Sequence, residues 1–483
     1  MKKVNPFLEK AAISVDGKFK DWQELNLKPY DKTTTKPYTK TRVILMNGTE
    51  FEQNWFLHRF YRCCNNNELR KEISNIRRRE QQQQKQLASL KPIDETDLET
   101  TIAYEQLAVD LTAILAKRVK DDRVKNALNF ALLEDFDHLY RYANLLEMEQ
   151  GVKAEELVGE YTEIMPGRPT IAEHRHPNAA VNEFICNICA DPFTKLATNI
   201  ITAAEQQTMN YYMNIANFHG SELGRKLYTE IAMIEEQHVS EYGSLLDTNC
   251  TWLENWLMHE YTECYLYYSC YMDETDENIR NLYHQFYLEE CGHLQKVAEL
   301  LKKYEGKDWC ALFPCGGDFP ELLKFEGNIE YIRKVLEETV CVTRDNCKYV
   351  LSGDLSPKSD FKMYNKQVNG GKSNDACHEV IEKRIKACGE DYRFETEPHP
   401  VSELQCRTCD NTTIARWNKK RLEDSSLFVF YPLFKISTTF PAKSGSLTPV
   451  FVFPKLRWRF CVASYFNSQT KAVSSPSLET PFS

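Results

Sequence analysis

Three segments of the chain repeat one spacing of residue types that bind metals. In each segment a Glu is followed thirty residues later by an acid, with a His three residues beyond it: Glu105, Asp135 and His138; Glu205, Glu235 and His238; Glu260, Glu290 and His293. The midpoints, at positions 120, 220 and 275, carry turn-forming sequences. Residues equally far from a hairpin turn lie at the same height on two antiparallel helices, since each residue rises about 1.5 Å. We therefore predict three helical hairpins in which these side chains meet.

The acid and the His of each set lie on adjacent turns of one helix face, where both can reach one ion. A helical wheel places Asp135 and His138 on a stripe with Leu128, Ala131 and Leu145, so the polar side chains point into an apolar core. Desolvating a carboxylate costs several kcal/mol unless a positive charge compensates it, and no Lys or Arg lies on these stripes. The pattern therefore predicts bound cations.

Helical context distinguishes these sets from chance matches. With 70 acidic residues and 11 His among 483 residues, roughly 1.6 acid-x-x-His pairs are expected, and five are present. Asp345, Asp375 and His378 even repeat the full spacing, but the chain between them runs through Asn369-Gly370-Gly371, which is not helical in character. Only the three sets above combine the spacing with helical periodicity.

A Glu from each of two helices and an acid-x-x-His pair from each of two others hold two metal ions in ferritin-like four-helix bundles. On these motifs, residues 100–305 resemble the ferritin-like di-iron carboxylate superfamily, which includes rubrerythrins, bacterioferritins and manganese catalases. The resemblance implies a mostly α fold built on such a bundle, with two iron ions as the cofactor and manganese as the alternative. It also implies these ligand roles: Asp135 and Glu235 bridge the ions, Glu105 and Glu205 are terminal ligands, and His138 and His238 each bind one ion.

Asp135 departs from the Glu that the family has at this position and is shorter by one methylene. The resemblance therefore implies a weaker bridge on that side, or a metal ion that lies closer to the neighbouring helix.

The topology of the family indicates which hairpins pair. Its second and third helices run parallel, so a long crossover joins them. Residues 149–194 supply such a crossover between the first and second hairpins, whereas a short link at 247–251 joins the second and third. The first two hairpins therefore make the better di-metal bundle. The third hairpin, with Glu260, Glu263, Glu290 and His293, is either an appended hairpin with a plugged polar face or a second, degenerate site.

The resemblance favours an oxidoreductase of the ferroxidase or peroxidase type, with oxygen or peroxide as its small-molecule partner and an electron donor protein as a further one. Carboxylates change denticity as the charge of a metal changes, and imidazole supplies a neutral ligand of borderline softness. Two alternatives stay open. One is a metal-binding, stress-associated protein without turnover, and the other is a metal-free helical scaffold, in which a Lys or Arg would take the place of the ions.

Charge and composition limit the partners and the compartment. The net charge of −10 argues against a nucleic-acid partner. We expect no signal peptide and no membrane partner, because no apolar stretch reaches the length of a membrane span. The 17 Cys are odd in number and scattered, which is typical of reduced thiols in the cytoplasm. The oligomeric state is left open.

The flanking segments carry weaker signals, and we divide the chain into residues 1–95, 96–305, 306–424 and 425–483. In the first segment we predict a strand at 42–46 and a helix at 50–90, whose polar stretch 77–84 is either a nucleic-acid-binding or partner-binding arm or a solvated helix face, and the net charge favours the latter. In the third we predict helices near 329–339 and 375–387. The last has a single acid, Glu479, among many Phe, Pro and Ser, and we expect an atypical tail without function.

Two further groups of residues resemble metal ligands. Cys186 and Cys189 could join Cys406 and Cys409 in a thiolate site, although unlinked thiols are the simpler interpretation. The run 173–176 in the crossover contains a Glu and two His, and a surface loop over the mouth of the bundle is the simpler interpretation there.

Overall fold

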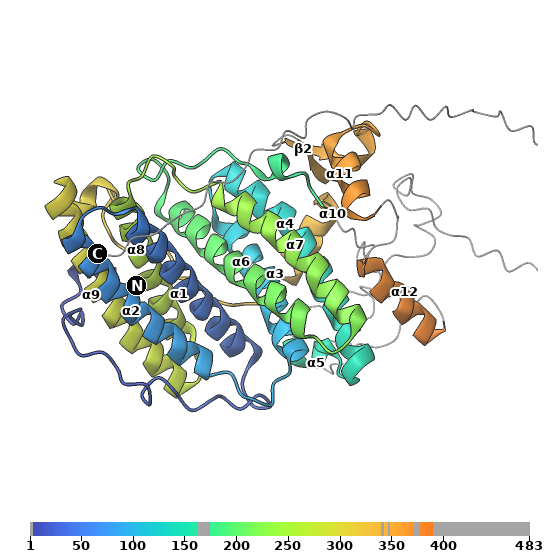
Figure 1. The fold of residues 1–483 in the computed structure, drawn as a ribbon, viewed down its shortest axis with the longest axis horizontal. Helices are drawn as coiled ribbons and strands as arrows, with labels where there is room; N and C mark the ends of the chain where they lie inside the picture. Colours follow the sequence, from blue (N-terminus) through green and yellow to red (C-terminus); the bar gives the residue numbers. More distant parts are fainter. Residues whose placement is uncertain are drawn as a thin grey trace, which may run out of the picture. The chain divides into compact units, whose positions relative to one another are not determined.

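The structure is a computed structural model that describes residues 3–159, 161–162, 164, 174–339, 342–345, 348–370 and 376–389. These residues are mostly α-helical, as predicted, with one antiparallel pair of short strands (Figure 1). The elements are α1 (Pro37–Cys63), α2 (Asn67–Ser89), α3 (Asp97–Arg118), α4 (Asp122–Gln150), α5 (Ala154–Val158), α6 (Pro192–Phe218), α7 (Glu222–Gly243), α8 (Trp252–Asp273), α9 (Glu277–Glu305), α10 (Ile329–Thr339), β1 (Val342–Asp345), β2 (Lys348–Leu351), α11 (Asp360–Val368) and α12 (Ala376–Cys388).

The three predicted hairpins are confirmed, and their turns fall where the sequence places them. The helices break at 119–121, 219–221 and 274–276. At each break a short polar side chain caps the next helix: Asp121, Ser221 and Asp276 accept hydrogen bonds from backbone N–H groups of the first turn. Each cap marks the start of the second helix of its hairpin. The two residues that lie fifteen positions before and after the turn are therefore at the same height along the hairpin.

The first bundle consists of α3, α4, α6 and α7, with α3 packed against α6 and α4 against α7. The start of α3 meets the end of α6, where Tyr211 donates a 3.2 Å hydrogen bond to the carbonyl of Asp97. The end of α4 meets the start of α7, where Glu149 lies 2.9 Å from Nε2 of His219. Both pairs are therefore antiparallel, so α4 and α6 run parallel and need the long crossover predicted between them.

The second bundle consists of α1, α2, α8 and α9. Arg42 near the start of α1 pairs at 2.9 Å with Glu274, which directly follows α8. Glu72 near the start of α2 pairs at 3.4 Å with Lys296 near the end of α9. The helix directions therefore match those of the first bundle. The third predicted hairpin is not an appendage, because it has a partner hairpin of its own.

The N-terminal prediction is wrong in three respects. Residues 42–46, predicted as a strand, lie inside α1. Residues 50–90, predicted as one helix, span two helices, and Asn66 caps the second. The stretch 77–84 is not a purely solvated face, because Glu80 and Gln83 are buried. The chain before residue 95 therefore shares a hydrophobic core with α8 and α9 instead of forming a separate segment.

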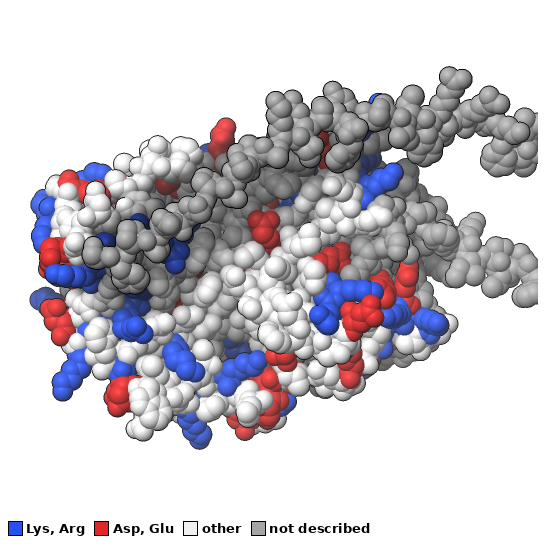
Figure 2. Space-filling model, viewed as in Figure 1, with Lys and Arg blue, Asp and Glu red and all other residues white. Residues whose placement is uncertain are grey.

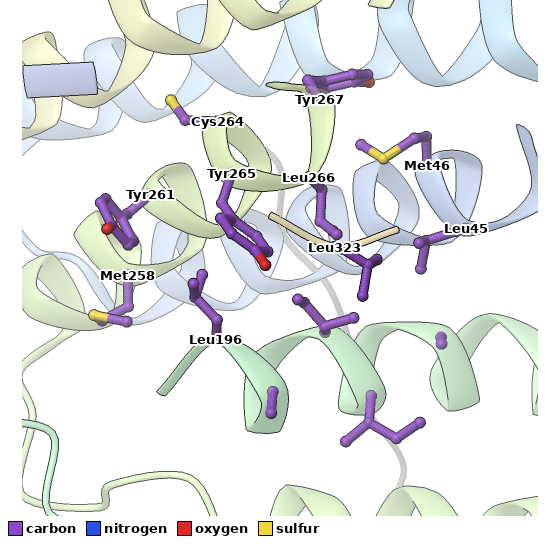
Figure 3. Packing of buried hydrophobic residues seen from close by; sticks show 14 of the residues in the cluster. Leu45, Met46, Leu196, Met258, Tyr261, Cys264, Tyr265, Leu266, Tyr267 and Leu323 are labelled. Atoms are coloured by element: carbon purple, nitrogen blue, oxygen red, sulfur yellow. The ribbon is translucent and has the colours of Figure 1, made fainter. Parts of the chain in front are cut away.

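The two bundles pack on each other through α1 and α8 of the second bundle and α3 and α6 of the first. Leu45 and Met46 of α1, Leu196 of α6 and Leu266 of α8 are fully buried in one continuous core (Figure 3). Full burial of such a side chain contributes about 1.5–3 kcal/mol, so this contact strongly fixes the four helices. These are the helices that carry the single Glu of each hairpin.

The C-terminal helices cover the first bundle. α10 and α12 confirm the helices predicted near 329–339 and 375–387. α10 packs on α4 through Ile332, and α12 packs on α4 and α7 through Val380. Cys406, Cys409 and the segment 390–483, which includes the tail predicted to lack function, lie outside the described residues.

Charged side chains of both signs are scattered over the visible surface of the bundles (Figure 2). On the face shown in Figure 2, Lys and Arg are interspersed with Asp and Glu. Within the described ranges, no helix combines the length and the apolar character needed to cross a membrane.

Candidate metal centre

Six polar side chains meet in the interior of the first bundle. They are Glu105 from α3, Asp135 and His138 from α4, Glu205 from α6, and Glu235 and His238 from α7. All six are between 0 and 2% exposed. These are the residues that the sequence places at equal distances from the two turns. The structure therefore brings the whole predicted set together in one buried cluster.

The six residues form two overlapping groups of donor atoms. Within each group the candidate ligand atoms lie within 4.8 Å of one another: Asp135, Glu205, Glu235 and His238 in one, and Glu105, His138 and Glu235 in the other. Glu235 belongs to both groups, which fits a carboxylate that bridges two ions. Asp135, the other expected bridge, belongs only to the group of His238, in keeping with its shorter side chain.

Both histidines direct Nδ1 toward the carboxylates. Nδ1 of His138 lies 2.9 Å from Oε1 of Glu235. Nδ1 of His238 lies 3.2 Å from Oε2 of the same residue and 3.5 Å from Oδ1 of Asp135. The centroids of the two rings are 6.0 Å apart. One carboxylate therefore separates two imidazoles, and each imidazole offers Nδ1 as a ligand atom.

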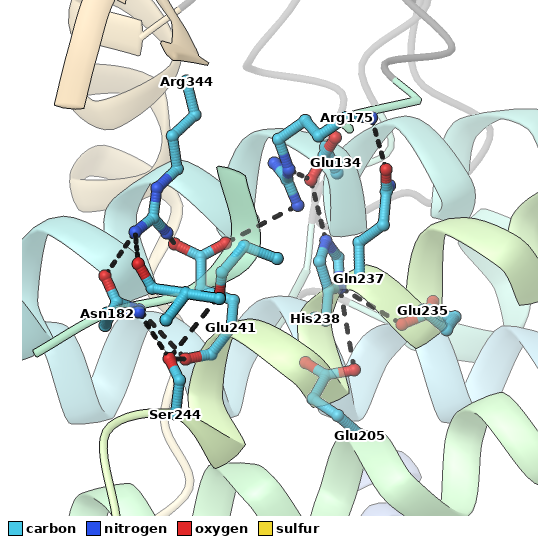
Figure 4. A network of polar contacts seen from close by, with 12 residues as sticks. Glu134, Arg175, Asn182, Glu205, Glu235, Gln237, His238, Glu241, Ser244 and Arg344 are labelled. Carbon is cyan, nitrogen blue, oxygen red and sulfur yellow. Dashed lines mark hydrogen bonds and ion pairs between the residues drawn. The ribbon is translucent and has the colours of Figure 1, made fainter. Parts of the chain in front are cut away.

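Glu134 supports His238 from the outer side. Its Oε2 lies 2.8 Å from Nε2 of His238 and accepts a 2.9 Å hydrogen bond from Nη1 of Arg175 in the crossover (Figure 4). A carboxylate at the outer ring nitrogen orients the imidazole and holds the proton there, which leaves Nδ1 free for a cation. The arrangement is typical of histidines that bind metals.

Sequence reasoning missed both supporting residues. Glu134 directly precedes Asp135, so its place in the chain was a usable signal, whereas Arg175 lies in a loop whose path the sequence does not show. Of the two histidines, only His238 has such a supporting acid within the described ranges. The residue that corresponds to Glu134 on α7, directly before Glu235, is Ile234. Accordingly, Nε2 of His138 has no hydrogen-bond partner among the described residues.

Hydroxyl groups orient two of the carboxylates. Tyr212 donates a 2.5 Å hydrogen bond to Oε1 of Glu105, and Thr112 donates a 3.3 Å hydrogen bond to Oδ2 of Asp135. In each case the other carboxylate oxygen has no hydrogen-bond partner in the described part of the chain. Each carboxylate is thus fixed by one oxygen while the second is free for a cation.

Burial determines the protonation of the cluster. Desolvation, together with the neighbouring carboxylates, raises the pKa of Glu105, Asp135 and Glu235 well above the usual range. Burial alone would lower the pKa of His238, but hydrogen bonds to the surrounding carboxylates outweigh it and hold that pKa well above its usual value. Burial lowers the pKa of His138. Such shifts mark acids that are crowded together with the imidazole of His238 as their nearby counter-charge, and a cation held among them would relieve that crowding.

The donor set fits a metal better than a protein cation. The buried arginines of this bundle, Arg141 and Arg175, form their described ion pairs with acids outside the cluster: Asp137, Glu230, Glu134 and Glu241. Both oxygens of Glu205 have no hydrogen-bond partner among the described residues. Four carboxylates and two imidazoles suit iron, manganese or zinc. The Lys or Arg expected in a metal-free scaffold does not pair with these acids in the described structure.

The third predicted set lies in the second bundle, beside two acids that sequence analysis did not identify. Glu80, Glu260, Glu290 and His293 form one group of ligand atoms, and Glu50, Glu80 and Glu263 form another. All six are between 0 and 2% exposed. Glu50 and Glu80 are again thirty residues apart, with Gln83 three residues further on. This hairpin escaped prediction because Gln83 stands where the other three sets have His.

The remaining candidate clusters are incomplete in the described part of the chain. The backbone N–H of Cys189 donates a 3.2 Å hydrogen bond to Sγ of Cys186, and hydrogen bonds with Cys189 lower the pKa of Cys186. The second thiol pair and Glu173 lie outside the described residues. His174 is buried, with Nε2 3.7 Å from Glu230. Neither cluster has a complete ligand set here.

No protein-family model matches the sequence, and neither a curated protein nor a solved structure matches the chain. The chemistry of the site must therefore be inferred from its own donor atoms. Those atoms can hold two cations about a shared carboxylate, with one imidazole on either side.

Proposed function

We propose that the first bundle is a ferritin-like di-metal carboxylate protein that acts as an oxidoreductase on oxygen or peroxide, of the ferroxidase or peroxidase type. Iron is the first choice of metal and manganese the alternative. One observation carries the proposal: six buried donors form two groups that share Glu235, while oxygens of Glu105, Asp135 and Glu205 have no hydrogen-bond partner among the described residues. Buried acids in that state need cations.

Some residues around the cluster would orient the ligands, and others would change how they bind the metals. Glu134 lies at Nε2 of His238 and would hold the proton there, so that Nδ1 would be free to bind an ion. Tyr212 fixes one oxygen of Glu105 and leaves the other to change its mode of binding. A bound iron pair would supply the electrons that reduce oxygen or peroxide, and carboxylates that change denticity accommodate the change in metal charge. Closing the catalytic cycle would need a source of electrons, which is further ferrous iron in a ferroxidase and an electron donor protein in a peroxidase.

Reconstitution with ferrous iron tests the proposal. The full chain is loaded anaerobically, freed of unbound metal, analysed for iron per chain, and then mixed with oxygen or hydrogen peroxide while the optical spectrum is recorded. We expect at least two ions per chain and oxidation of the bound iron within the mixing experiment. The matched control is a chain in which Glu235 is replaced by Ala, because that residue belongs to both donor groups.

Two results would overturn parts of the proposal. Absence of stoichiometric iron, manganese or zinc after reconstitution would rule out the metal centre and favour the helical scaffold. Stoichiometric iron that neither oxygen nor peroxide oxidises would rule out the oxidoreductase and leave the metal-binding protein without turnover.

A further inference from the structure

We propose that the second bundle holds a di-metal centre of its own, and that its two positions differ in donor type. One position has His293, and the other has only oxygen donors. Two hairpins that are far apart in the sequence build this site, since Glu50 and Glu80 come from α1 and α2 whereas the remaining donors come from α8 and α9.

The geometry repeats that of the first bundle. Glu80 belongs to both donor groups, as Glu235 does in the first bundle. Nδ1 of His293 lies 2.9 Å from Oε1 of Glu80, the same separation as between His138 and Glu235. It also lies 3.0 Å from Oε2 of Glu290. The imidazole therefore offers Nδ1 to a position shared by two carboxylates.

The terminal acids are oriented in the same way in both bundles. Tyr267, seven residues after Glu260, donates a hydrogen bond to Oε1 of Glu50. Tyr212, seven residues after Glu205, does the same for Glu105. Each tyrosine thus fixes one oxygen of an acid on the partner hairpin, and the other oxygen of that acid has no hydrogen-bond partner among the described residues.

Unpartnered oxygens point to a ligand that balances the acids. Both oxygens of Glu263 and one oxygen each of Glu50 and Glu260 lack a hydrogen-bond partner in the described part of the chain, although all three residues are fully buried. Lys20, a nearby cation, pairs at 3.3 Å with Glu289, which is not a member of either donor group. Burying five carboxylates around one imidazole without cations would be strongly unfavourable.

The donor types differ between the two positions. Gln83, which replaces the second His, donates a 2.6 Å hydrogen bond from its amide to Oε1 of Glu290. Glu263, one turn beyond Glu260, supplies an additional carboxylate beside Glu50 and Glu80. A position with carboxylates alone prefers a hard cation such as manganese over zinc, whereas the position with His293 suits either.

The structure leaves room beside the histidine. A cavity of about 230 Å³ is lined by His293 and Glu289 of α9, by Arg79 of α2, and by Lys18 and Lys20 of the N-terminal segment. Because three of these side chains are cations, the cavity suits a small anionic ligand beside the His293 position better than a further metal ion.

Metal counting on the full chain, loaded with manganese(II) alone, tests the inference. The first centre is removed by combining Glu235→Ala with His238→Ala, and far-UV circular dichroism verifies that the helices persist. We expect about four ions in the unaltered chain and about two in this background. Adding Glu50→Gln and Glu263→Gln should then remove about one ion, whereas Glu299→Gln, an exposed acid of α9, should remove none.

A background chain that is folded and binds no manganese would overturn the inference while leaving the proposed function intact. Two ions in both the unaltered chain and the background would support this centre and instead refute the first. Should the background fail to fold, Glu50→Gln with Glu263→Gln in the unaltered chain gives the same answer, because retention of every ion there contradicts the inference. A second readout is the Gln83→His variant, which restores an imidazole at the spacing of the other three hairpins and should raise the zinc-to-manganese ratio of the second bundle. An unchanged ratio in the folded, metal-loaded variant would contradict the inferred difference in donor type.

Discussion

The two bundles share one plan but differ in donors. Each joins two helical hairpins with the same helix directions, and each carries the thirty-residue spacing twice. The first bundle has four carboxylates and two imidazoles, whereas the second has five carboxylates and one imidazole. In the second bundle Gln83 replaces a His and Glu263 adds an acid one turn beyond Glu260. With one imidazole fewer and one carboxylate more, the cluster of the second bundle is more negative than that of the first. It should therefore prefer harder or more highly charged metal ions.

The outer contacts also correspond. In the first bundle Glu134 contacts His238 and is held by Arg175 from the crossover. In the second, Glu289 lies 3.2 Å from Nε2 of Gln83 and is held by Lys20 from the N-terminal segment. Both supports consist of an acid that precedes a ligand and a cation from a segment outside the helices. The supporting acid is retained where the His is not, which indicates that the two hairpin pairs share a structural plan wider than the ligands.

The largest loss of metal is expected when the carboxylate that belongs to both donor groups of a bundle is removed. Glu235→Ala should remove about two ions from the first bundle, because this residue belongs to both of its donor groups. Glu80→Ala should do the same in the second bundle and leave the first loaded. Iron per chain and the optical spectrum of the two variants measure this. Loss of all metal from both variants would show that the bundles are not independent.

A smaller loss is expected when one histidine is removed. His238→Ala should empty one of the two positions of the first bundle, because His238 belongs to one donor group only. The helices should persist, since ligand loss in a formed bundle affects the ion more than the apolar packing. Gln83→Ala is the comparison in the second bundle and should cost no ion. Full metal content with an unchanged spectrum in His238→Ala would mean that His238 is only a core histidine.

Much of the first bundle could be predicted because its information is local. The hairpin turns lie midway between matched ligands, and short polar residues such as Asp121 and Ser221 cap the helices there. The resemblance to ferritin-like bundles implies parallel second and third helices, and the long crossover at 149–194 indicated that α4 and α6 are this pair. The equal heights of Glu105 and Asp135 follow from the rise of the helix alone. What this bundle binds is a separate question that the fold does not answer.

The second bundle was predicted only in part: the spacing predicts the hairpin of α8 and α9, but the pairing of that hairpin with α1 and α2 depends on contacts between residues that are distant along the chain. Arg42 begins a run of apolar residues typical of a strand, but its ion pair with Glu274 and the packing of α1 on α8 favour a helix. Glu80 stands among Arg and Gln, and its ligand neighbours follow about two hundred residues later. Local patterns contain no sign of such a contact. A spacing search that allowed Gln in place of His would have found this hairpin.

Replacing the outer acids Glu134 and Glu289 should lower the affinity for metal ions without removing an ion at saturating metal. Glu134→Gln should weaken metal binding at the His238 position by about 10–100-fold, the usual effect of altering a carboxylate that orients a metal-bound imidazole. Glu289→Gln should have a smaller effect, because its partner is the amide of Gln83 and not an imidazole. Titration with a chelator of known affinity measures both. Equal weakening in the two variants would indicate that Gln83 is itself a metal ligand.

The smallest effect concerns the segment that covers the second bundle. A Cβ on Gly292 would lie 1.8 Å from the carbonyl oxygen of Ile13, so Gly292→Ala must displace the N-terminal segment from α9. Such overpacking costs about 1–3 kcal/mol, and we expect a corresponding decrease in thermal stability. The first bundle has Asp137 at the matching position before His138, where its carboxylate pairs with Arg141. Gly243→Ala in α7 is the control, because nothing lies within 4 Å of its Cβ position, and it should be neutral or slightly stabilising. Differential scanning calorimetry of the two variants decides the point, and equal melting temperatures would show that residues 10–17 do not pack on the helix in solution.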